Sequence, residues 1–437
     1  MDLLPCGHAA HAGASRVCRH LLDPEKQDEE SVWLLTGTGL EHDLCCPACD
    51  GADDPPEMFV ACEGCVGRVE DEAEIVAWRG RPGIAERPEP VDGTVLRTTL
   101  PEPLRGLLDL APAAGRGWLV LTAGMRVARF DADGGAFELL ASADVPGEPD
   151  HEPWAGHELR RRLYGSADGR FAAVVNDYGH HGAVIDLRTG RRTMTLHGGD
   201  YRPDTVPFSV AFAEHRGRTV VVHRTEWNRL DVSDAATGAL LSERTTGRES
   251  GHDLDYFHGR LHVSPDGEWI ADDGWVWSPA GLPVVWSLRR WLDGAAWESE
   301  DGPSREVLCQ RWYHWNSPMC WVADGLFAVS GLGTDDDALL DGVRLFDAAT
   351  GTPAQAFPGP RGELFADARR LYAATADGLE IWDPLTGELT GRVSGFVPSW
   401  HHSRAGELAA ISQDGTELLR WRTAAFRRGG ESRDAVR

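Results

Sequence analysis

From residue 91 onward, apolar and polar residues alternate in short segments that are separated by turns rich in Gly and Asp. Alternation with a period of two is the pattern of a β-strand with one buried face. No convincing helical pattern longer than about two turns interrupts the series. The pattern therefore predicts that most of the chain is all-β and built from many short strands.

One unit recurs along this region: an apolar strand, then Asp, two further residues and Thr-Gly, then a second strand. The Asp side chain accepts hydrogen bonds from amides two residues further on, and Gly adopts the positive φ that closes a tight hairpin. Full copies of the turn are Asp186–Gly190, Asp234–Gly238, Asp347–Gly351 and Asp383–Gly387, with degenerate copies at Asp131–Gly135 and Ser278–Gly281. The mean spacing of about 50 residues fits a four-stranded propeller blade of ~40–45 residues with a few loop insertions.

The repeat predicts seven blades, with expected ranges 103–146, 155–198, 206–247, 256–294, 308–358, 362–395 and 397–423. The last range holds only about three strands. Residues 93–100, which precede the first blade, are expected to supply its missing outer strand and so remove exposed sheet edges. A pair of β-sandwiches is the alternative fold, but it would not require a repeated turn.

About residues 91–424 resemble WD-repeat and related bacterial propellers. The resemblance is at the level of the fold, since only Trp382-Asp383 reproduces the dipeptide of the WD-repeat family. It implies a seven-bladed β-propeller and, by analogy, a protein that docks partners on one face.

The cysteines divide the chain, because seven of the nine fall in the first 65 residues. Four pairs with ligand spacing stand there: Cys6 with His8, Cys18 with His20, Cys46 with Cys49, and Cys62 with Cys65. A C-x-x-C turn lets two thiolates converge on one tetrahedral ion at about 2.3 Å, and a second pair closes the site. The odd cysteine total and the absence of an export signal argue against a secreted disulfide framework.

Eight ligands predict about two closed zinc sites, paired either sequentially or in a cross-braced manner. Cys45 could replace Cys46 as a ligand, and the alternative is that some of these residues are buried free thiols and surface histidines. The order C-x-H, Val17-Cys18-Arg19-His20-Leu21, C-x-x-C, C-x-x-C resembles a small zinc-binding module of bacterial proteins, over about residues 5–70. The resemblance supports the eight ligands but implies no activity. Closed zinc sites are structural, and a short segment depends on metal for its stability.

The expected domains are a zinc-binding module (1–78), a linker rich in Pro, Arg and Glu (79–90), the propeller (91–424) and a disordered tail (425–437). The net charge of −26 repels phosphate backbones, so the sequence predicts neither nucleic-acid nor anionic-membrane partners. No apolar run approaches the ~20 residues of a membrane span, and no signal peptide is recognised. A cytoplasmic location is expected.

Several inter-blade loops concentrate His, Asp, Tyr and Trp, in residues 150–157, 177–181, 251–256, 311–315 and 400–402. Because most of them precede the innermost strand of a blade, they are expected to gather on one face around the central channel. The candidate binding face comprises His181, His252, His314, Trp315, Trp400 and His401. The competing interpretation is that the polar tips solvate loops and the tryptophans pack between blades.

No nucleophile elbow, zinc-protease helix or phosphate-binding loop is present, so no catalytic residue and no cofactor besides structural zinc is assigned. The preferred hypothesis is a non-enzymatic adaptor that docks a protein or peptide on the propeller. The alternative is a propeller enzyme, hydrolase or lyase, that uses His, Asp and Tyr of the inter-blade loops. A nucleic-acid-reading zinc module is a third hypothesis, and its acidic composition counts against it.

Overall fold

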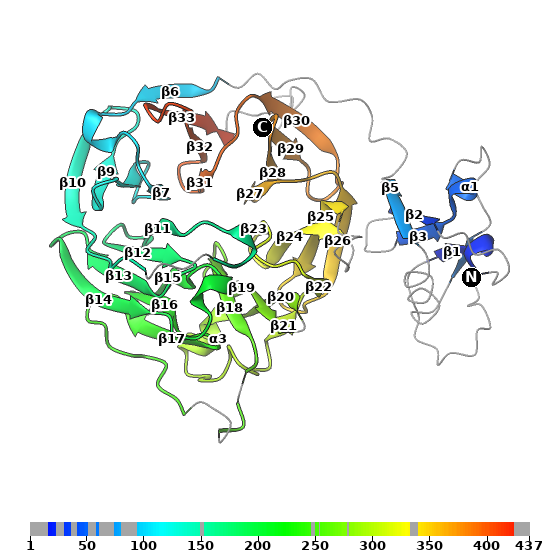
Figure 1. The fold of residues 1–437 in the computed structure, drawn as a ribbon, viewed down its shortest axis with the longest axis horizontal. Coiled ribbons are helices and arrows are strands. Elements are labelled where there is room, and N and C mark those ends of the chain that lie inside the picture. The colour runs from blue at the N-terminus through cyan, green and yellow to red at the C-terminus, as the bar shows by residue number, and fades with distance from the viewer. Residues whose placement is uncertain are drawn as a thin grey trace, which may run out of the picture.

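The computed structural model describes residues 16–22, 30–35, 42–50, 58–60, 74–79, 94–148, 153–245, 250–252, 254–277, 279–332 and 340–423. Residues 94–423 form seven antiparallel sheets arranged as the blades of a closed ring (Figure 1). The predicted all-β, seven-bladed propeller is therefore confirmed. The expected tail, 425–437, lies outside the described residues.

Within each blade the strands follow one another from the innermost to the outermost. The closing blade differs only in its outermost strand, which comes from the start of the ring. The first blade contains β7 (Asp109–Pro112), β8 (Trp118–Leu121), β9 (Arg126–Phe130) and β10 (Phe137–Ser142). The second contains β11 (Arg160–Gly165), β12 (Phe171–Asp177), β13 (His181–Asp186) and β14 (Arg191–His197). The third contains β15 (Val210–His215), β16 (Arg218–Glu226) and β17 (Arg229–Asp234).

The remaining blades follow the same order. The fourth contains β18 (Phe257–Val263), β19 (Trp269–Val276), β20 (Ala280–Ser287), β21 (Glu306–Val307) and β22 (Arg311–Trp312). The fifth contains β23 (Met319–Ala323), β24 (Leu326–Leu332), β25 (Leu340–Asp347) and β26 (Pro353–Pro358). The sixth contains β27 (Glu363–Asp367), β28 (Arg370–Thr375), β29 (Gly378–Trp382) and β30 (Leu389–Ser394). The seventh contains β31 (Trp400–His402), β32 (Glu407–Ile411), β33 (Glu417–Arg422) and β6 (Leu96–Thr99).

The hydrophobic core is divided among the interfaces between neighbouring blades, with one buried cluster at each interface. In β12, Phe171, Ala173 and Val175 pack toward the third blade. Ala172 and Val174 of the same strand pack toward the first blade. Successive side chains of a strand point to opposite faces, so a strand between two neighbours must be apolar on both faces to bury them.

The Asp-x-x-Thr-Gly turns follow the third strands of their blades. At Asp186, the carboxylate Oδ1 accepts hydrogen bonds from the Arg188 and Thr189 amides at 2.9 and 3.1 Å. Gly190 has a φ of +69° and donates its N–H to the Asp186 carbonyl. These are the contacts that the sequence pattern predicts for a tight hairpin.

The ring closes through β6, whose residues Leu96–Thr99 pair with β33 in an antiparallel register that sets Thr98 opposite Leu418. Arg420 of β33 also donates to the carbonyl of Ala132 in the first blade, at 2.9 Å. The predicted closure by residues 93–100 is therefore confirmed. The edge of β33 is thereby paired with a strand from the start of the ring.

The fourth blade does not end where the sequence pattern placed it, at residue 294. A short helix, α3 (Leu288–Leu292), follows β20, and the outer edge of β20 is paired by β21 and β22 instead. Ser287 caps this helix by accepting a hydrogen bond from Arg290 N–H at 3.2 Å. The predicted ranges 256–294 and 308–358 are wrong at this boundary, because the outer strands come after an insertion.

The third blade has three strands in the described residues, and β17 forms its outer edge. A short returning segment satisfies that edge without forming a strand. Leu241 N–H donates to the Val232 carbonyl at 2.8 Å, and Val232 N–H donates to Ser242 Oγ at 2.8 Å. The Arg244 guanidinium then donates to the Leu230 carbonyl at 2.8 Å.

The N-terminal residues form a separate five-stranded sheet with the order β4-β1-β3-β2-β5. Its strands are β1 (Arg16–Cys18), β2 (Glu30–Leu35), β3 (His42–Cys45), β4 (Met58–Val60) and β5 (Glu74–Arg79). The short helices are η1 (Arg19–Leu22) and α1 (Pro47–Asp50) here, and η2 (Glu102–Leu104), η3 (Trp154–Gly156) and η4 (Pro203–Thr205) in the propeller. None of the helices in the described ranges has both the length and the apolar character that a membrane crossing requires.

Candidate functional site

A Cys/His cluster forms where two parallel strands of the N-terminal sheet end. β1 and β3 pair in parallel with Val17 opposite Leu44, so the residues that follow, Cys18 and Cys46, arrive side by side. Cys46 N–H donates to Cys18 Sγ at 3.3 Å. The turn of α1 then returns Cys49 to the same place, with its N–H bonded to the Cys46 carbonyl at 3.0 Å.

The geometry of the cluster suits a tetrahedral ion. The ligand atoms of Cys18, His20, Cys46 and Cys49 all lie within 4.8 Å of one another. His20 Nδ1 is 3.1 Å from Cys49 Sγ and 3.7 Å from Cys46 Sγ. Ligands bound to zinc at about 2.3 Å for sulfur and 2.0–2.1 Å for nitrogen stand roughly 3.5–3.8 Å apart. These four side chains could therefore hold one metal ion after small movements.

The electrostatics of the cluster favour a cation. Burial, followed by the hydrogen bond with Cys46 and the charge of Cys18, raises the pKa of the Cys49 thiol to about 12. Sulfur atoms that oppose one another's ionisation in this way are stabilised as thiolates when a divalent cation binds between them. All three cysteines are buried, whereas His20 is exposed.

The cluster differs from both pairings that the sequence predicted. Cys18 and His20, the second pair along the chain, meet Cys46 and Cys49, the third pair, whereas a sequential arrangement joins the first pair to the second and a cross-braced one joins the second pair to the fourth. Cys45 is buried but is not part of the cluster, so Cys46 and not Cys45 is the candidate ligand. The other four predicted ligands, Cys6, His8, Cys62 and Cys65, lie outside the described residues.

A contiguous group of aromatic rings, here called the aromatic face, covers the fourth blade where β18 begins and β19 ends. Its members are Trp154, Tyr201, Trp227, Phe257, Trp275, Trp277 and Trp315. Trp275 and Phe257 are fully buried and stack at 4.6 Å between ring centres. Trp154, Tyr201 and Trp277 are 38, 49 and 46% exposed. A buried aromatic base thus holds three exposed rings.

Three loops from different blades converge on this face. Trp154, from the loop before the second blade, reaches Trp275 of the fourth blade at 5.4 Å. Trp154 also lies 5.1 Å from Trp315, in the loop before the fifth blade. Trp315 stacks on Trp275 at 4.7 Å and donates its indole N–H to the Thr205 carbonyl, in the loop before the third blade. The aromatic face is therefore fixed by contacts that link four blades.

The loop that carries Trp315 has an unusual backbone. Tyr313 and Asn316 have φ values of +60° and +57°, a region that side-chain-bearing residues adopt at a cost of order 1–3 kcal/mol. Tyr313 is 62% exposed, while buried atoms of His314 and Asn316 have no hydrogen-bond partner among the described residues. Backbone strain of this kind persists only where surrounding contacts enforce it. In this loop those contacts are the ring packing of Trp315 against Trp275 and Trp154.

Three of the four predicted binding histidines, His181, His252 and His314, lie in different surroundings. His181 begins β13, and its Nδ1 is 3.0 Å from Glu148 Oε1. His252 stacks on Trp297 at 4.3 Å and its Nδ1 contacts Asp301 Oδ2 at 2.8 Å. His314 belongs to the strained loop beside Trp315. Each histidine therefore has its own partners, and none of these contacts joins one of the three to another.

Trp400 and His401 lie in β31, the inner strand of the seventh blade, rather than in a loop. The Trp400 indole donates to Asp109 Oδ1 of β7 at 2.7 Å. Burial, the largest effect, lowers the pKa of His401 to about 4 even though Asp367 acts in the opposite direction. These two residues contribute to contacts between blades.

Charged residues on the inner strands form a network that the sequence analysis did not single out. Arg162 of β11 donates to Asp177 Oδ2 at 2.9 Å and lies 3.7 Å from Asp109 Oδ1. Arg260 of β18 lies 3.6 Å from Glu363 of β27. Their partners lie on other strands, so the sequence around Arg162 and Arg260 carried no signal for their pairing.

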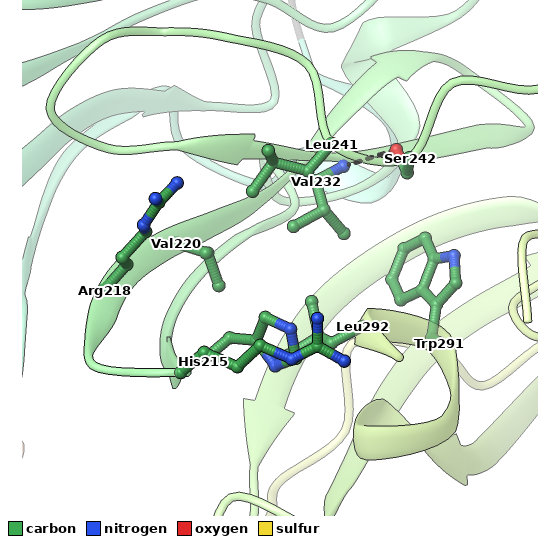
Figure 2. A pocket seen from close by; sticks show the side chains of 9 residues that line it. His215, Arg218, Val220, Val232, Leu241, Ser242, Trp291 and Leu292 are labelled. Carbon is green, nitrogen blue, oxygen red and sulfur yellow. Dashed lines mark hydrogen bonds between the residues drawn. The ribbon is translucent and has the colours of Figure 1, made fainter. Parts of the chain in front are cut away.

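A pocket of about 390 Å³ lies beside β17, the outer strand of the third blade in the part of the chain that the structure describes (Figure 2). Its apolar wall consists of Val220, Val232, Leu241, Trp291 and Leu292, and its polar rim of His215, Arg216, Arg218 and Ser242. Arg216 is paired with Asp293 at 2.9 Å. The pocket is a direct consequence of α3 packing beside a three-stranded blade.

Neither a protein-family model nor a curated protein matches the chain. Solved structures match its fold. One is a chain of "Crystal Structure of Mitotic Checkpoint Complex", with a TM-score of 0.48 and 14% identity, covering 77% of this chain and 95% of that chain. Another is a chain of hydrazine synthase from Kuenenia stuttgartiensis, with a TM-score of 0.50 and 15% identity, covering 77% of this chain and 99% of that chain. At such identities the likeness concerns the fold alone.

Proposed function

We propose that this protein is a non-enzymatic interaction scaffold that docks a protein or peptide partner on the aromatic face. The observation that supports this proposal is the packing of three exposed rings, Trp154, Tyr201 and Trp277, over a buried aromatic base. Trp and Tyr are the residues that most often anchor protein interfaces, because they bury large areas with little loss of rotamer freedom. Rings already fixed by their neighbours lose still less on binding.

The chemistry of the surface indicates the kind of partner. The net charge of −26 favours a partner that carries basic residues around an apolar or aromatic anchor. Binding of this kind is strengthened by charge at long range and by ring packing at contact. We therefore expect the partner segment to be basic and its affinity to fall as the salt concentration rises.

We further propose that the N-terminal module is held together by two structural zinc ions. Cys18, His20, Cys46 and Cys49 would hold the first ion. Cys6, His8, Cys62 and Cys65, the first and last ligand pairs along the chain, would then hold the second ion, so that one site is nested within the other in the sequence. A site closed by four protein ligands leaves no open position for substrate, so the ions would supply folding stability and no chemistry.

The docking proposal is tested with Trp154→Ala and Trp277→Ala, because their rings are exposed enough to be removed without opening the core. Leu385→Ala is the matched control, since Leu385 is 74% exposed in an Asp-x-x-Thr-Gly turn away from these rings. Affinity capture from the native host, followed by titration of the identified partner, should show at least about a 30-fold loss for an anchor tryptophan. Unchanged binding in both tryptophan variants, with unchanged melting temperatures, would refute the aromatic face as the docking surface.

The zinc proposal is tested by counting ions in double variants. Cys18→Ser with Cys49→Ser should remove one zinc ion, because both residues belong to the same site. Cys49→Ser with Cys62→Ser should remove two. A sequential pairing predicts the reverse, so elemental analysis of freshly purified protein separates the two arrangements.

A further inference from the structure

A second group of metal-ligating side chains lies in the second blade of the propeller. The register of β13 and β14 places His181 opposite His197, so His180, one residue earlier in the turn, lies beside the end of β14. Asp200 follows His197 by three residues. Ligand atoms of His180, His197 and Asp200 all lie within 4.8 Å of one another.

The separations within this group fit a shared cation. His197 Nε2 lies 3.6 Å from Asp200 Oδ1. The His180 ring lies near the same oxygen, with its non-ligating Nδ1 3.9 Å away. The two imidazole rings are 5.6 Å apart between centres. Nitrogen and oxygen ligands bound at about 2.0–2.2 Å stand roughly 3–4 Å apart around one ion. Small side-chain rotations would bring all three to a common centre.

The backbone carbonyl of Gly199 contacts His180, and the backbone N–H of Gly199 contacts His197. Its carbonyl can only accept, so His180 Nδ1, 3.0 Å away, must carry the proton. This leaves the lone pair of His180 on Nε2, the state of an imidazole that binds a metal and is held by a backbone carbonyl behind it. Gly199 N–H donates to His197 Nδ1 at 3.3 Å. Metal binding through His197 Nε2 would break this contact, and its length makes it a weak one.

Gly199 can take this position because it lacks a side chain. Its φ is +83°, and a Cβ atom there would lie 2.7 Å from Glu226 Oε2 and 2.9 Å from Glu226 Cα. The close approach of the backbone to Glu226 therefore sets the peptide that faces both rings. Any other residue would shift that peptide and with it the two imidazoles.

We propose that His180, His197 and Asp200 bind one divalent transition-metal ion. Two imidazoles and one carboxylate suit Zn²⁺, Ni²⁺, Co²⁺ or Fe²⁺ and not Mg²⁺ or Ca²⁺, which prefer oxygen ligands. The side chains of His197 and Asp200 are 49 and 93% exposed, so three protein ligands leave positions open to water or a ligand. This site differs from the N-terminal cluster, which has four ligands and contains thiolates.

Two neighbouring features support cation binding at this place. The net charge of −26 raises the local concentration of cations around the protein. The carboxylate of Glu148 accepts hydrogen bonds from the Asn176 side chain and from the His181 N–H, and so lies beside the site. His181, held by Glu148, has its ring centre 5.5 Å from that of His197. A negative charge and a third imidazole thus border the proposed ion.

The test uses Co²⁺ as the probe and the full-length protein, loaded with zinc and then freed of excess zinc. Zinc binds thiolate sites more tightly than Co²⁺ does, so the N-terminal cysteines stay occupied. Calorimetry should show one Co²⁺ equivalent in the unaltered protein and at least a 10-fold weaker binding in His197→Ala and in Asp200→Asn. Both side chains are accessible, and equal melting temperatures without metal would verify that these variants are folded.

His252→Ala is the matched control, because His252 is also an accessible histidine beside a carboxylate, Asp301, but belongs to no group of metal-ligating side chains among the described residues. It should bind Co²⁺ as the unaltered protein does, and so should Cys49→Ser. Equal Co²⁺ affinity in the His197→Ala variant and the unaltered protein would overturn the proposal. A thiolate-to-cobalt charge-transfer band that accompanies the binding would also overturn it, since this band would place the ion at cysteines.

Discussion

The indole of Trp400 donates to the carboxylate of Asp109, 2.7 Å away, and joins the last blade of the ring to the first. The other oxygen of Asp109 accepts from Leu163 N–H of the second blade, also at 2.7 Å. Burial raises the pKa of Asp109, and Arg162 and these hydrogen bonds oppose that effect. One carboxylate therefore binds three consecutive blades, on strands that are far apart in the chain.

Replacing Trp400 by Phe should lower the free energy of unfolding by about 1–3 kcal/mol, because a buried acceptor loses its donor. Urea denaturation at pH 7 measures the change. Trp277→Phe, at a ring 46% exposed, controls for the smaller ring. If both variants unfold at the same urea concentration, the Trp400–Asp109 bond contributes nothing to stability.

The parts of the fold that local chemistry determines could be predicted from the sequence. Asp186 and Gly190 form their turn through contacts within five residues, so the turn and its repeats are visible in the chain. The closing strand was also predictable, because the last blade was one strand short. The boundary after β20 was not, since it depends on where β21 and β22 pair after an insertion.

The sites show the same division. Ligand spacing indicated the metal residues, but their pairing depends on the parallel register of Val17 and Leu44, which no local pattern encodes. Trp315 was a candidate from its loop, whereas Trp277 became part of the aromatic face only through contacts with β18 and β19. The sequence pattern did not single out His197 and Asp200 as candidate ligands. His197 ends the outer strand β14 and Asp200 follows it, whereas the candidate loops were those that precede inner strands.

Ring closure predicts different behaviour for two truncated chains. A chain that starts at residue 85 keeps β6 and should yield a folded, soluble β-domain. A chain that starts at residue 105 exposes the edge of β33, to which Leu96–Thr99 are paired, and should aggregate. Size-exclusion chromatography and circular dichroism of both chains make the comparison, and equal solubility would contradict the role of β6.

The stability of the propeller should depend on the protonation of His401. Burial lowers its pKa to about 4, whereas a histidine of an unfolded chain has a pKa near 6.5. The unfolded state therefore binds the proton first. The stability contributed by neutral His401 is complete above about pH 6.5 and is lost as the pH falls toward 4, by at most about 1.4 kcal/mol per pH unit.

His401→Gln should remove this part of the pH dependence, because the new side chain does not titrate. Urea denaturation at pH 7.5 and at pH 5 would show a smaller loss of stability on acidification than in the unaltered protein. Leu385→Gln, at a side chain that is 74% exposed and does not titrate, is the control and should leave the difference unchanged. Identical differences in all three proteins would show that His401 is not protonated on unfolding.

The side chain of Arg244 donates to a backbone carbonyl at the outer edge of β17, in the third blade. Its guanidinium donates to the Leu230 carbonyl at 2.8 Å and to Asp231 Oδ1 at 2.9 Å, and it is paired with Glu300. The Arg244 side chain is 1% exposed and the two carboxylates are buried. The guanidinium therefore satisfies both the open edge of β17 and two buried negative charges.

Arg244→Met should lower the free energy of unfolding by roughly 3–5 kcal/mol, because it removes the arginine paired with the buried Glu300 and leaves Asp231 with Arg229 alone. It should also free the edge of β17 to pair with other molecules, so light scattering should rise with protein concentration. Arg244→Lys keeps the charge but not the planar guanidinium that reaches a carbonyl and two carboxylates together. Its free energy of unfolding should lie between those of the unaltered protein and Arg244→Met.

Arg216→Met is the control. It removes an exposed pair with Asp293 and should lower the free energy of unfolding by only about 0–1 kcal/mol. If Arg244→Met is no more harmful than Arg216→Met, the edge of β17 does not depend on the guanidinium.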